Sequence, residues 1–227
     1  MAAGAVAPGP GFVPRARLCL LFTTRSLAIG VVLTVAVVSW SLRPGWPRAA
    51  PPTTGENIIA FGDSLVAGHG ATPGKDFVSV LARRLRTPIV NAGRSGDTTA
   101  SALDRLNSDV LSRNPRVVIV LLGGNDFLRG VPSEETFRNL STIVERIRSR
   151  GAAVVLVGVS VGLFTDPYDD QYEALARRTS AGLIADILDD ILGHSDRMSD
   201  SIHPNDRGYE VIADRLEPAL RDLIHPE

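Results

Sequence analysis

The stretch Asn57–Leu65, NIIAFGDSL, joins an apolar run to a tight turn that contains glycine. A short apolar run bounded by turn residues predicts a buried strand. The turn places Ser64 at the carboxyl end of that strand, where a helix can begin and backbone N–H groups face the same space as the hydroxyl. This position suits a nucleophile, although Gly-Asp-Ser is also ordinary turn and N-cap composition.

A second segment near the other end of the chain supplies the partners that a serine nucleophile needs. It is DSIHPN, which carries Asp200 and His203 three positions apart. A hydroxyl nucleophile needs a base to take its proton, and the base needs a group that holds its tautomer and stabilises the imidazolium. Ser64, His203 and Asp200 fill these three roles, and their combination favours the catalytic interpretation over the turn.

From residue 57 onward, short apolar runs alternate with longer amphipathic runs, which is typical of a three-layer α/β domain. Right-handed crossovers would make the strands parallel, with helices on both faces. The predicted strands are Asn57–Phe61, Ile89–Asn91, Val117–Leu122, Ala153–Val159 and Gly182–Ala185. The predicted helices are Asp76–Arg86, Thr98–Arg113, Ser133–Arg150, Tyr168–Arg178 and Asp206–Ile224.

Polar and glycine-rich loops follow the predicted strands. In a parallel α/β sheet the functional crevice lies outside the carboxyl ends of the strands, so these loops converge on one rim. Attack on an ester carbonyl creates an oxyanion that needs preorganised donors. The candidates are the backbone N–H groups of Ser64 and Gly96 and the side-chain amide of Asn125. Taken singly, Gly96 is equally a turn glycine and Asn125 a loop-capping amide.

Three aspartates in these loops, Asp63, Asp97 and Asp126, are interpreted as N-caps and braces of the backbone. They could also be metal ligands, but the four histidines show no metal-binding spacing. The sequence therefore predicts no metal site. The remaining histidines, interpreted as solvated or hydrogen-bonded bystanders, are His69, His194 and His225.

The bulk composition restricts the partners and the core. Lys and Arg number 24 against 25 Asp and Glu, for a net charge of −1. This balance argues against a nucleic-acid partner, which usually meets a clustered basic face. Apolar residues make up 44% and aromatic residues 5%, so the core must come mainly from Val, Leu, Ile and Ala, as in a buried parallel sheet. The single Cys19 excludes an intrachain disulfide.

The chain begins with a basic segment, residues 1–25, followed by an uncharged apolar stretch, residues 26–42. About 17 residues is the lower limit for a helix that spans a bilayer. No clean small-x-small cleavage site follows, which favours an uncleaved anchor over a signal peptide. Residues 43–56, rich in Pro and Ala, are interpreted as a linker, and residues 57–227 as the catalytic domain.

Arginines around the apolar stretch predict the orientation of the chain. Three precede it and two follow it, a slight bias toward an N-terminus inside the cell. The catalytic domain would then be membrane-anchored outside the cytoplasm, on the periplasmic side. A signal peptide would instead give an exported protein.

Four blocks of polar and glycine-rich sequence stand in order along the chain: Phe61–Leu65, Asn91–Thr98, Gly123–Asp126 and Asp200–Asn205. Taken together, they resemble the signature blocks of the SGNH hydrolases, also called the GDSL esterase/lipase family. The pairing of Ser-Gly-Asp-Thr with Gly-Gly-Asn-Asp is most similar to the bacterial arylesterase and lysophospholipase/acyl-thioesterase group. Val66 stands where the Gly-x-Ser-x-Gly elbow of α/β-hydrolases has its second glycine, so the chain differs from that fold.

The resemblance implies a flavodoxin-like sheet, a Ser–Asp–His triad, an oxyanion hole from Ser64, Gly96 and Asn125, and no cofactor. The expected function is a serine esterase acting on acyl or aryl carboxylic esters, lysophospholipids or acyl thioesters. The expected partners are a small-molecule or lipid ester and, through the N-terminal helix, the membrane. The same blocks support a carbohydrate O-deacetylase, and a binding module that keeps the fold without turnover is the alternative from another class.

Overall fold

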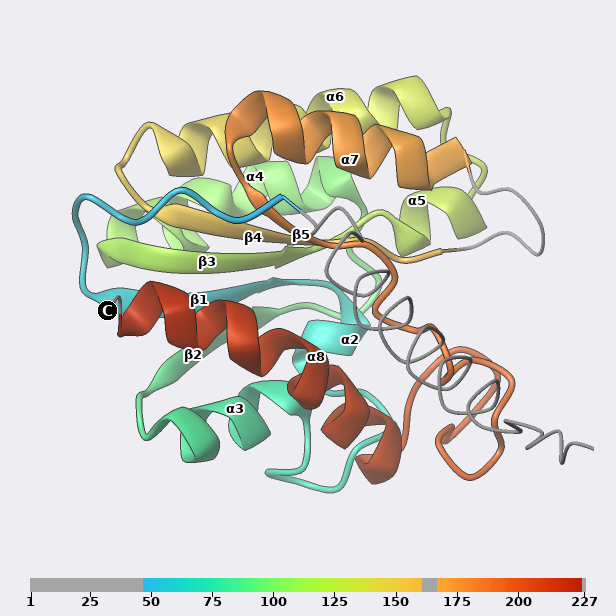
Figure 1. Cartoon of the computed structure of the whole chain (residues 1–227). Helices are drawn as coiled ribbons and strands as arrows, with labels where there is room; N and C mark the ends of the chain where they lie inside the picture. The colour runs from blue at the N-terminus through green and yellow to red at the C-terminus, as the bar shows by residue number, and fades with distance from the viewer. Residues whose placement is uncertain (1–46, 161–166, 226–227) are drawn as a thin grey trace, which may run out of the picture. The chain divides into compact units, whose positions relative to one another are not determined.

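The computed structural model of the chain describes residues 47–160 and 167–225. Its centre is a five-stranded parallel sheet with the strand order β2-β1-β3-β4-β5 (Figure 1). The predicted parallel α/β sheet is therefore confirmed. The strands are β1 (Asn57–Gly62), β2 (Ile89–Gly93), β3 (Pro115–Leu121), β4 (Ala153–Val157) and β5 (Gly182–Ile184).

Helices cover both faces of the sheet (Figure 1). Successive side chains of β1 point to opposite faces, so Ile58 and Ala60 enter one core while Ile59 and Phe61 enter the other. Because both faces are buried, the strands are continuously apolar rather than alternating. One core contains α3 (Phe77–Leu85) and α8 (Asp206–Ile224), and the other contains α4 (Thr99–Asp109), α6 (Ser133–Arg148) and α7 (Pro167–Thr179).

Two short helices at the rim of the sheet, α2 (Ser64–Ala67) and α5 (Gly124–Leu128), were not predicted. Each is too short to show helical periodicity. The predicted helix Thr98–Arg113 is also wrong at its end, because α4 stops at Asp109 and residues Leu111–Arg113 form a separate 3₁₀ turn. These differences add two short helices and move one helix end, and they leave the order of the predicted strands and helices unchanged.

The described part of the predicted linker is hydrogen-bonded to the domain. Backbone N–H groups of Leu183 and Ala50 donate to Pro47 and Ser180, at 2.9 and 3.0 Å, so this segment runs beside β5. Farther along, the N–H of Thr53 donates to Gly151 at 2.8 Å. The predicted basic segment and apolar stretch lie outside the described residues. None of the described helices is both long enough and apolar enough to cross a bilayer.

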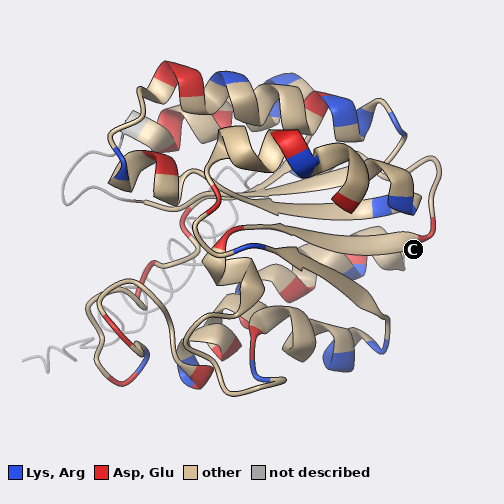
Figure 2. Cartoon of the chain, turned by 180° about the vertical axis from the view of Figure 1, so that it is seen from behind, with Lys and Arg blue, Asp and Glu red and all other residues tan. Residues whose placement is uncertain are grey.

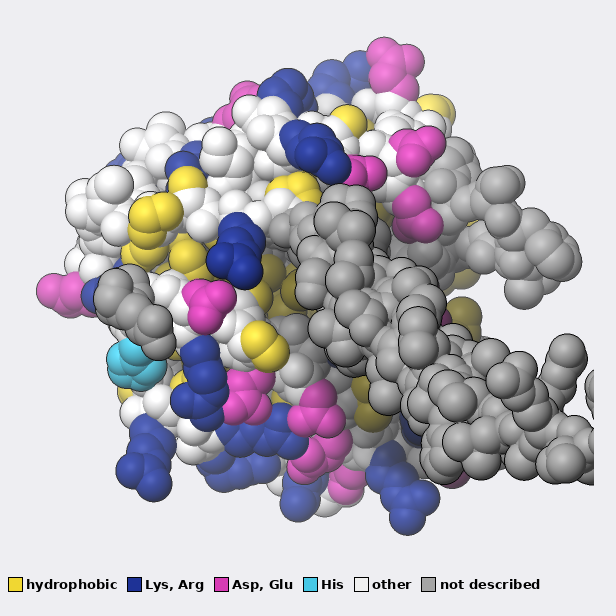
Figure 3. Space-filling model, in the orientation of Figure 1, with side chains coloured by type: hydrophobic (Ala, Val, Ile, Leu, Met, Phe, Trp, Pro, Cys, Tyr) yellow, Lys and Arg dark blue, Asp and Glu magenta, His cyan; other side chains and the backbone are white. Residues whose placement is uncertain are grey.

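The outer surfaces of the helices carry both signs of charge, as Figures 2 and 3 show from opposite sides. Arg84 on α3, for example, lies 2.6 Å from Glu210 and 2.6 Å from Asp214, both on α8. This pairing fastens the two helices that cover one face of the sheet.

Candidate active site

The candidate site lies where the winding of the sheet changes direction. The chain passes from β1 to β2 on one side of β1 and then crosses from β2 to β3 on its other side, and parallel sheets bind ligands at such a switch point. A cavity of about 590 Å³ lies there, lined by Ser64, Gly96, Asn125 and His203. A separate cavity of about 840 Å³, between residues 47–51, β5 and α8, contains none of the predicted site residues.

Ser64 is positioned by the turn that follows β1. Gly62 passes so close to β3 that a Cβ atom there would lie 2.2 Å from the carbonyl oxygen of Leu121, so only glycine fits. Asp63 then caps α2, because its carboxylate accepts the N–H of Leu65 at 3.0 Å. Ser64 is thereby fixed as the first residue of α2, where it lines the cavity.

Ser64, His203 and Asp200 form one continuous line of contacts. His203 Nε2 lies 3.0 Å from Ser64 Oγ, and His203 Nδ1 lies 2.8 Å from Asp200 Oδ2. The N–H of Ile202, the His203 ring and the N–H of His203 all bond the Asp200 carboxylate, and they lower the pKa of Asp200 to about 2. Asp200 is therefore ionised at neutral pH and can hold the imidazole in one orientation.

The loop that carries the histidine is held by Asn205, to which the sequence reasoning gave no role of its own. Its amide donates to the carbonyl of Asp196 at 3.0 Å, and its oxygen caps α8 by accepting the N–H groups of Arg207 and Gly208. The N–H of Ser199 also donates to the carbonyl of His203 at 2.9 Å. These bonds fix the backbone on which His203 is mounted.

The three predicted oxyanion donors line the same cavity. Gly96 has a φ of +82°, a left-handed conformation that favours glycine, and its carbonyl accepts a bond of 2.7 Å from Arg129. The amide nitrogen of Asn125 donates to the carbonyl of Asp97 at 3.0 Å. The same nitrogen donates to Asp63 Oδ2 at 3.4 Å, a long bond that a ligand in the cavity would have to replace to receive this second N–H.

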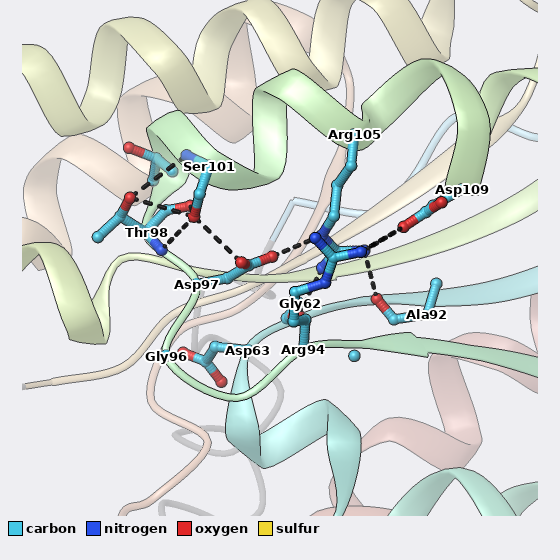
Figure 4. Close-up of polar contacts among 12 residues, drawn as sticks. Gly62, Asp63, Ala92, Arg94, Gly96, Asp97, Thr98, Ser101, Arg105 and Asp109 are labelled. Atoms are coloured by element: carbon cyan, nitrogen blue, oxygen red, sulfur yellow. Dashed lines mark hydrogen bonds and ion pairs between the residues drawn. The ribbon is translucent and has the colours of Figure 1, made fainter.

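The three predicted aspartates make different contacts. Asp63 is 3% exposed, and burial raises its pKa to about 6 against the opposing effect of the Leu65 N–H. Asp97 pairs with Arg105 Nε at 2.5 Å (Figure 4). Asp126 accepts the N–H and the hydroxyl of Thr99, at 2.9 and 2.6 Å, and so joins α5 to α4.

Arg105 is a buried residue that the sequence reasoning missed. Its guanidinium donates to the carbonyls of Gly62 and Ala92, each at 2.9 Å, and lies 4.4 Å from the ring centroid of Phe61. Figure 4 shows how these bonds, with the Asp97 pair, tie the ends of β1 and β2 to α4. One feature of the sequence could have indicated that Arg105 is buried: it lies on the same face of α4 as the apolar residues Ala102 and Leu106.

His69 was expected to be a bystander, and this expectation is incomplete. Its side chain is exposed, but it lines the cavity, and its ring centroid lies 4.3 Å from that of His203. No local pattern in the sequence could reveal this contact, because it joins the loop after α2 to a loop near the end of the chain.

An apolar rim of exposed side chains forms part of the lining of the cavity. The large hydrophobic side chains that stay exposed among the described residues all belong to it, with exposed fractions from 42% to 61%. Two of them come from α5 and two from the segment before α8. The residues of the apolar rim are Phe127, Leu128, Leu192 and Ile202.

Known proteins resemble most of the described domain. The GDSL-like lipase/acylhydrolase family matches residues 60–211, a span that includes every predicted site residue. The arylesterase of Vibrio mimicus is 30% identical over 183 residues, which are 76% of this chain and 92% of that protein. The thioesterase 1/protease 1/lysophospholipase L1 of Escherichia coli is 29% identical over 186 residues, 78% and 88% of the two chains. The crystal structure of TesA covers 74% of this chain and 99% of its own, with 30% identity and a TM-score of 0.70.

Proposed function

The chain belongs to the GDSL-like lipase/acylhydrolase family and is an ester hydrolase; from this premise we propose that it cleaves carboxylic esters with an extended acyl chain through a covalent acyl intermediate on Ser64. One observation carries the proposed chemistry, the line of contacts from Ser64 Oγ through the His203 ring to the Asp200 carboxylate. Nucleophile, base and orienting group stand in the order that acyl transfer requires.

The proposed reaction has two halves. His203 Nε2 accepts the Ser64 proton as Oγ bonds the acyl carbon, and ionised Asp200 stabilises the imidazolium. The tetrahedral intermediate collapses, the bond to the alcohol or thiol breaks, and His203 returns its proton to that leaving group. Water then repeats the sequence on the acyl-serine, releases the carboxylic acid and regenerates Ser64.

The oxyanion of each tetrahedral intermediate is proposed to accept the N–H groups of Ser64 and Gly96 and the Asn125 N–H that otherwise reaches Asp63 at 3.4 Å. Each such donor contributes on the order of 3 kcal/mol to the transition state. The bond from Asn125 to the carbonyl of Asp97 supports this role, because it holds the amide in place before substrate arrives.

The apolar rim supports the proposed substrate class. A chain of methylene groups lying along it is removed from water, which stabilises the complex by about 0.8 kcal/mol per buried CH₂. An acetyl group would be too short to cover the rim, so the rim favours longer acyl esters over the alternative of a carbohydrate O-deacetylase. Relatives that carry the names arylesterase and thioesterase/lysophospholipase extend the proposal to aryl esters, acyl thioesters and lysophospholipids.

A fluorophosphonate probe tests the nucleophile. We expect one adduct, mapped by mass spectrometry to Ser64, and its loss in Ser64→Ala. The matched control is Ser95→Ala, which removes another serine of the same cavity and should still be labelled. An unlabelled chain would favour a binding module, and an adduct at a different serine would overturn the assignment of Ser64.

Chain-length profiling tests the substrate class. We expect kcat/KM to rise from p-nitrophenyl acetate through butanoate to octanoate. Leu128→Ser and Leu192→Ser should reduce the octanoate-to-acetate ratio, since each removes apolar contact from the rim. Acetate as the best substrate, with a ratio insensitive to both variants, would contradict an extended acyl chain and favour the deacetylase.

We further propose, from the sequence alone, that residues 26–42 anchor the chain in a membrane and that the catalytic domain lies outside the cytoplasm.

A further inference from the structure

We propose that His69, His203 and Asp200 form a binding site for one divalent transition-metal ion of the Zn²⁺ class, and that the bound ion switches the hydrolase off. The binding depends only on the geometry of the three side chains. The switching rests on the proposed function of His203 as the general base.

The three residues supply donors that suit such an ion. One ligand atom from each residue can be chosen so that all three lie within 4.8 Å of one another. Zinc is bound by imidazole nitrogen and carboxylate oxygen at about 2.0 to 2.2 Å, in a tetrahedral arrangement. Adjacent ligands then stand about 3.4 Å apart, so shifts of roughly 1 Å bring the three atoms onto one ion, with water as the fourth ligand.

The backbone already holds His69 in place for this site. Its N–H donates to the carbonyl of Ser64 at 3.0 Å, and its carbonyl accepts the hydroxyl of Tyr209 at 2.8 Å. The next residue, Gly70, packs so closely that a Cβ atom would lie 2.2 Å from Ser199 Oγ. The loop of His69 is therefore docked on the loop of His203, and the two rings meet without a backbone rearrangement.

The carboxylate of Asp200 is also held in place for this site. Its Oδ1 accepts the N–H groups of Ile202 and His203, each at 2.8 Å, which fixes the carboxylate beside the His203 ring. Two neutral imidazoles and one carboxylate leave a net charge of +1 on a site with a divalent ion.

A bound ion would remove the general base whichever nitrogen of His203 it takes. On Nε2, the ion occupies the lone pair that would accept the proton of Ser64. On Nδ1, the ion displaces the proton facing Asp200, and the neutral ring then carries its proton on Nε2. In both arrangements the nitrogen 3.0 Å from Ser64 Oγ can no longer accept a proton, so the enzyme is inactive until the ion leaves.

Zinc titration of the full chain, purified without a histidine tag, tests the site. Equilibrium dialysis against Zn²⁺ should give one ion per chain, and His69→Gln should weaken this binding by roughly tenfold or more. The matched control is His194→Gln. His194 lies 3.4 Å from Asp190 and so offers an exposed histidine–carboxylate pair without a neighbouring imidazole. This control should bind Zn²⁺ as the unaltered chain does.

Ester turnover and fluorophosphonate labelling, measured in the same titration, test the switch. Turnover and labelling should both fall as the ion binds and recover when a chelator is added. In His69→Gln, the same fractional loss, measured against that variant's own metal-free rate, should need roughly tenfold more Zn²⁺. Binding that is absent, or unchanged in His69→Gln, overturns the site and leaves the proposed function standing. Binding at His69 without loss of labelling overturns the switch and the role of His203 as base.

Discussion

At the scale of single residues, two aspartates near the candidate nucleophile have opposite electrostatic environments. Asp200 accepts three hydrogen bonds at an exposed position, which lowers its pKa, whereas burial beside Ser64 raises the pKa of Asp63. Environments that push the pKa values of neighbouring carboxyls apart give them separate roles. Only Asp200 contacts the ring of His203 among these two, so the orienting role is assigned to Asp200 and not to Asp63.

Asp200→Asn should lower kcat by several orders of magnitude, about 10⁴-fold in a serine triad, because an amide cannot stabilise the imidazolium or hold the correct tautomer. The melting temperature should change little. Asp126→Asn on α5 and Asp97→Asn on the loop after β2 are the controls and should act mainly on the melting temperature. Near-normal turnover of Asp200→Asn, beside a folded but inactive control, would show that the wrong carboxylate has been assigned.

Asp63→Asn should change how stability depends on pH. The folded-state pKa of Asp63, about 6, lies above its unfolded value of 3.8, so the native state holds the proton more tightly. This carboxyl therefore favours the folded state below pH 3.8, and that stabilisation is lost as the pH rises to about 6. The loss amounts to at most about 3 kcal/mol. The free energy of unfolding, measured with urea at pH 4, 5, 6 and 7, should depend less on pH in the asparagine variant than in the unaltered chain. The same pH dependence in both proteins would show that Asp63 is not a buried carboxyl with a raised pKa.

At the scale of elements, α4 is tied to the catalytic rim by one ion pair. Arg105 on this helix bonds Asp97 on the loop after β2 and also the carbonyl oxygens that end β1 and β2. Gly96 lies next to Asp97, so the position of this proposed oxyanion donor depends on where α4 packs (Figure 4). A buried helix contact is thereby coupled to the geometry of the site.

Arg105→Met should lower the free energy of unfolding by about 3 to 5 kcal/mol, since it leaves Asp97 buried and without its countercharge. The double variant Arg105→Met/Asp97→Asn should recover part of this loss, which chemical denaturation of the single and double variants would measure as a coupling energy. Strictly additive losses would show that the pair contributes no interaction of its own.

At the scale of the whole molecule, the position of the catalytic domain relative to a membrane depends on residues 1–46, which lie outside the described part. The first described residue, Pro47, accepts the N–H of Leu183 on its carbonyl at 2.9 Å, so the described part of the chain starts beside β5.

The full chain with a C-terminal tag should fractionate with membranes, and protease should digest the tag in spheroplasts. An uncharged stretch of about 17 residues and the arginines before it are the reasons for this expectation. A cytoplasmic protein of known location serves as the control for intact spheroplasts. A protected tag would contradict the topology, and a shortened soluble form would establish a cleaved signal peptide.

The amino-acid sequence by itself determined the order of strands and helices and the parallel sheet. A strand that is buried on both faces appears as a continuous apolar run, such as Val117–Leu122, and a helix that covers the sheet appears as an amphipathic run, such as Ser133–Arg150. Both patterns are local and can be recognised in the sequence. The short helices α2 and α5 span less than two turns and carry no such period. The residues proposed for catalysis were also named from the sequence, because strand-end loops and the Asp-x-x-His spacing are short-range patterns.

Only the tertiary structure decided which distant side chains meet. The pair of Arg105 with Asp97, the ring of His69 against His203 and the apolar rim each join segments that lie apart along the chain. The physical reason is that hydrophobic periodicity specifies which face of an element is buried, while the partner of a buried charge or an exposed ring depends on how the loops pack after the sheet has formed.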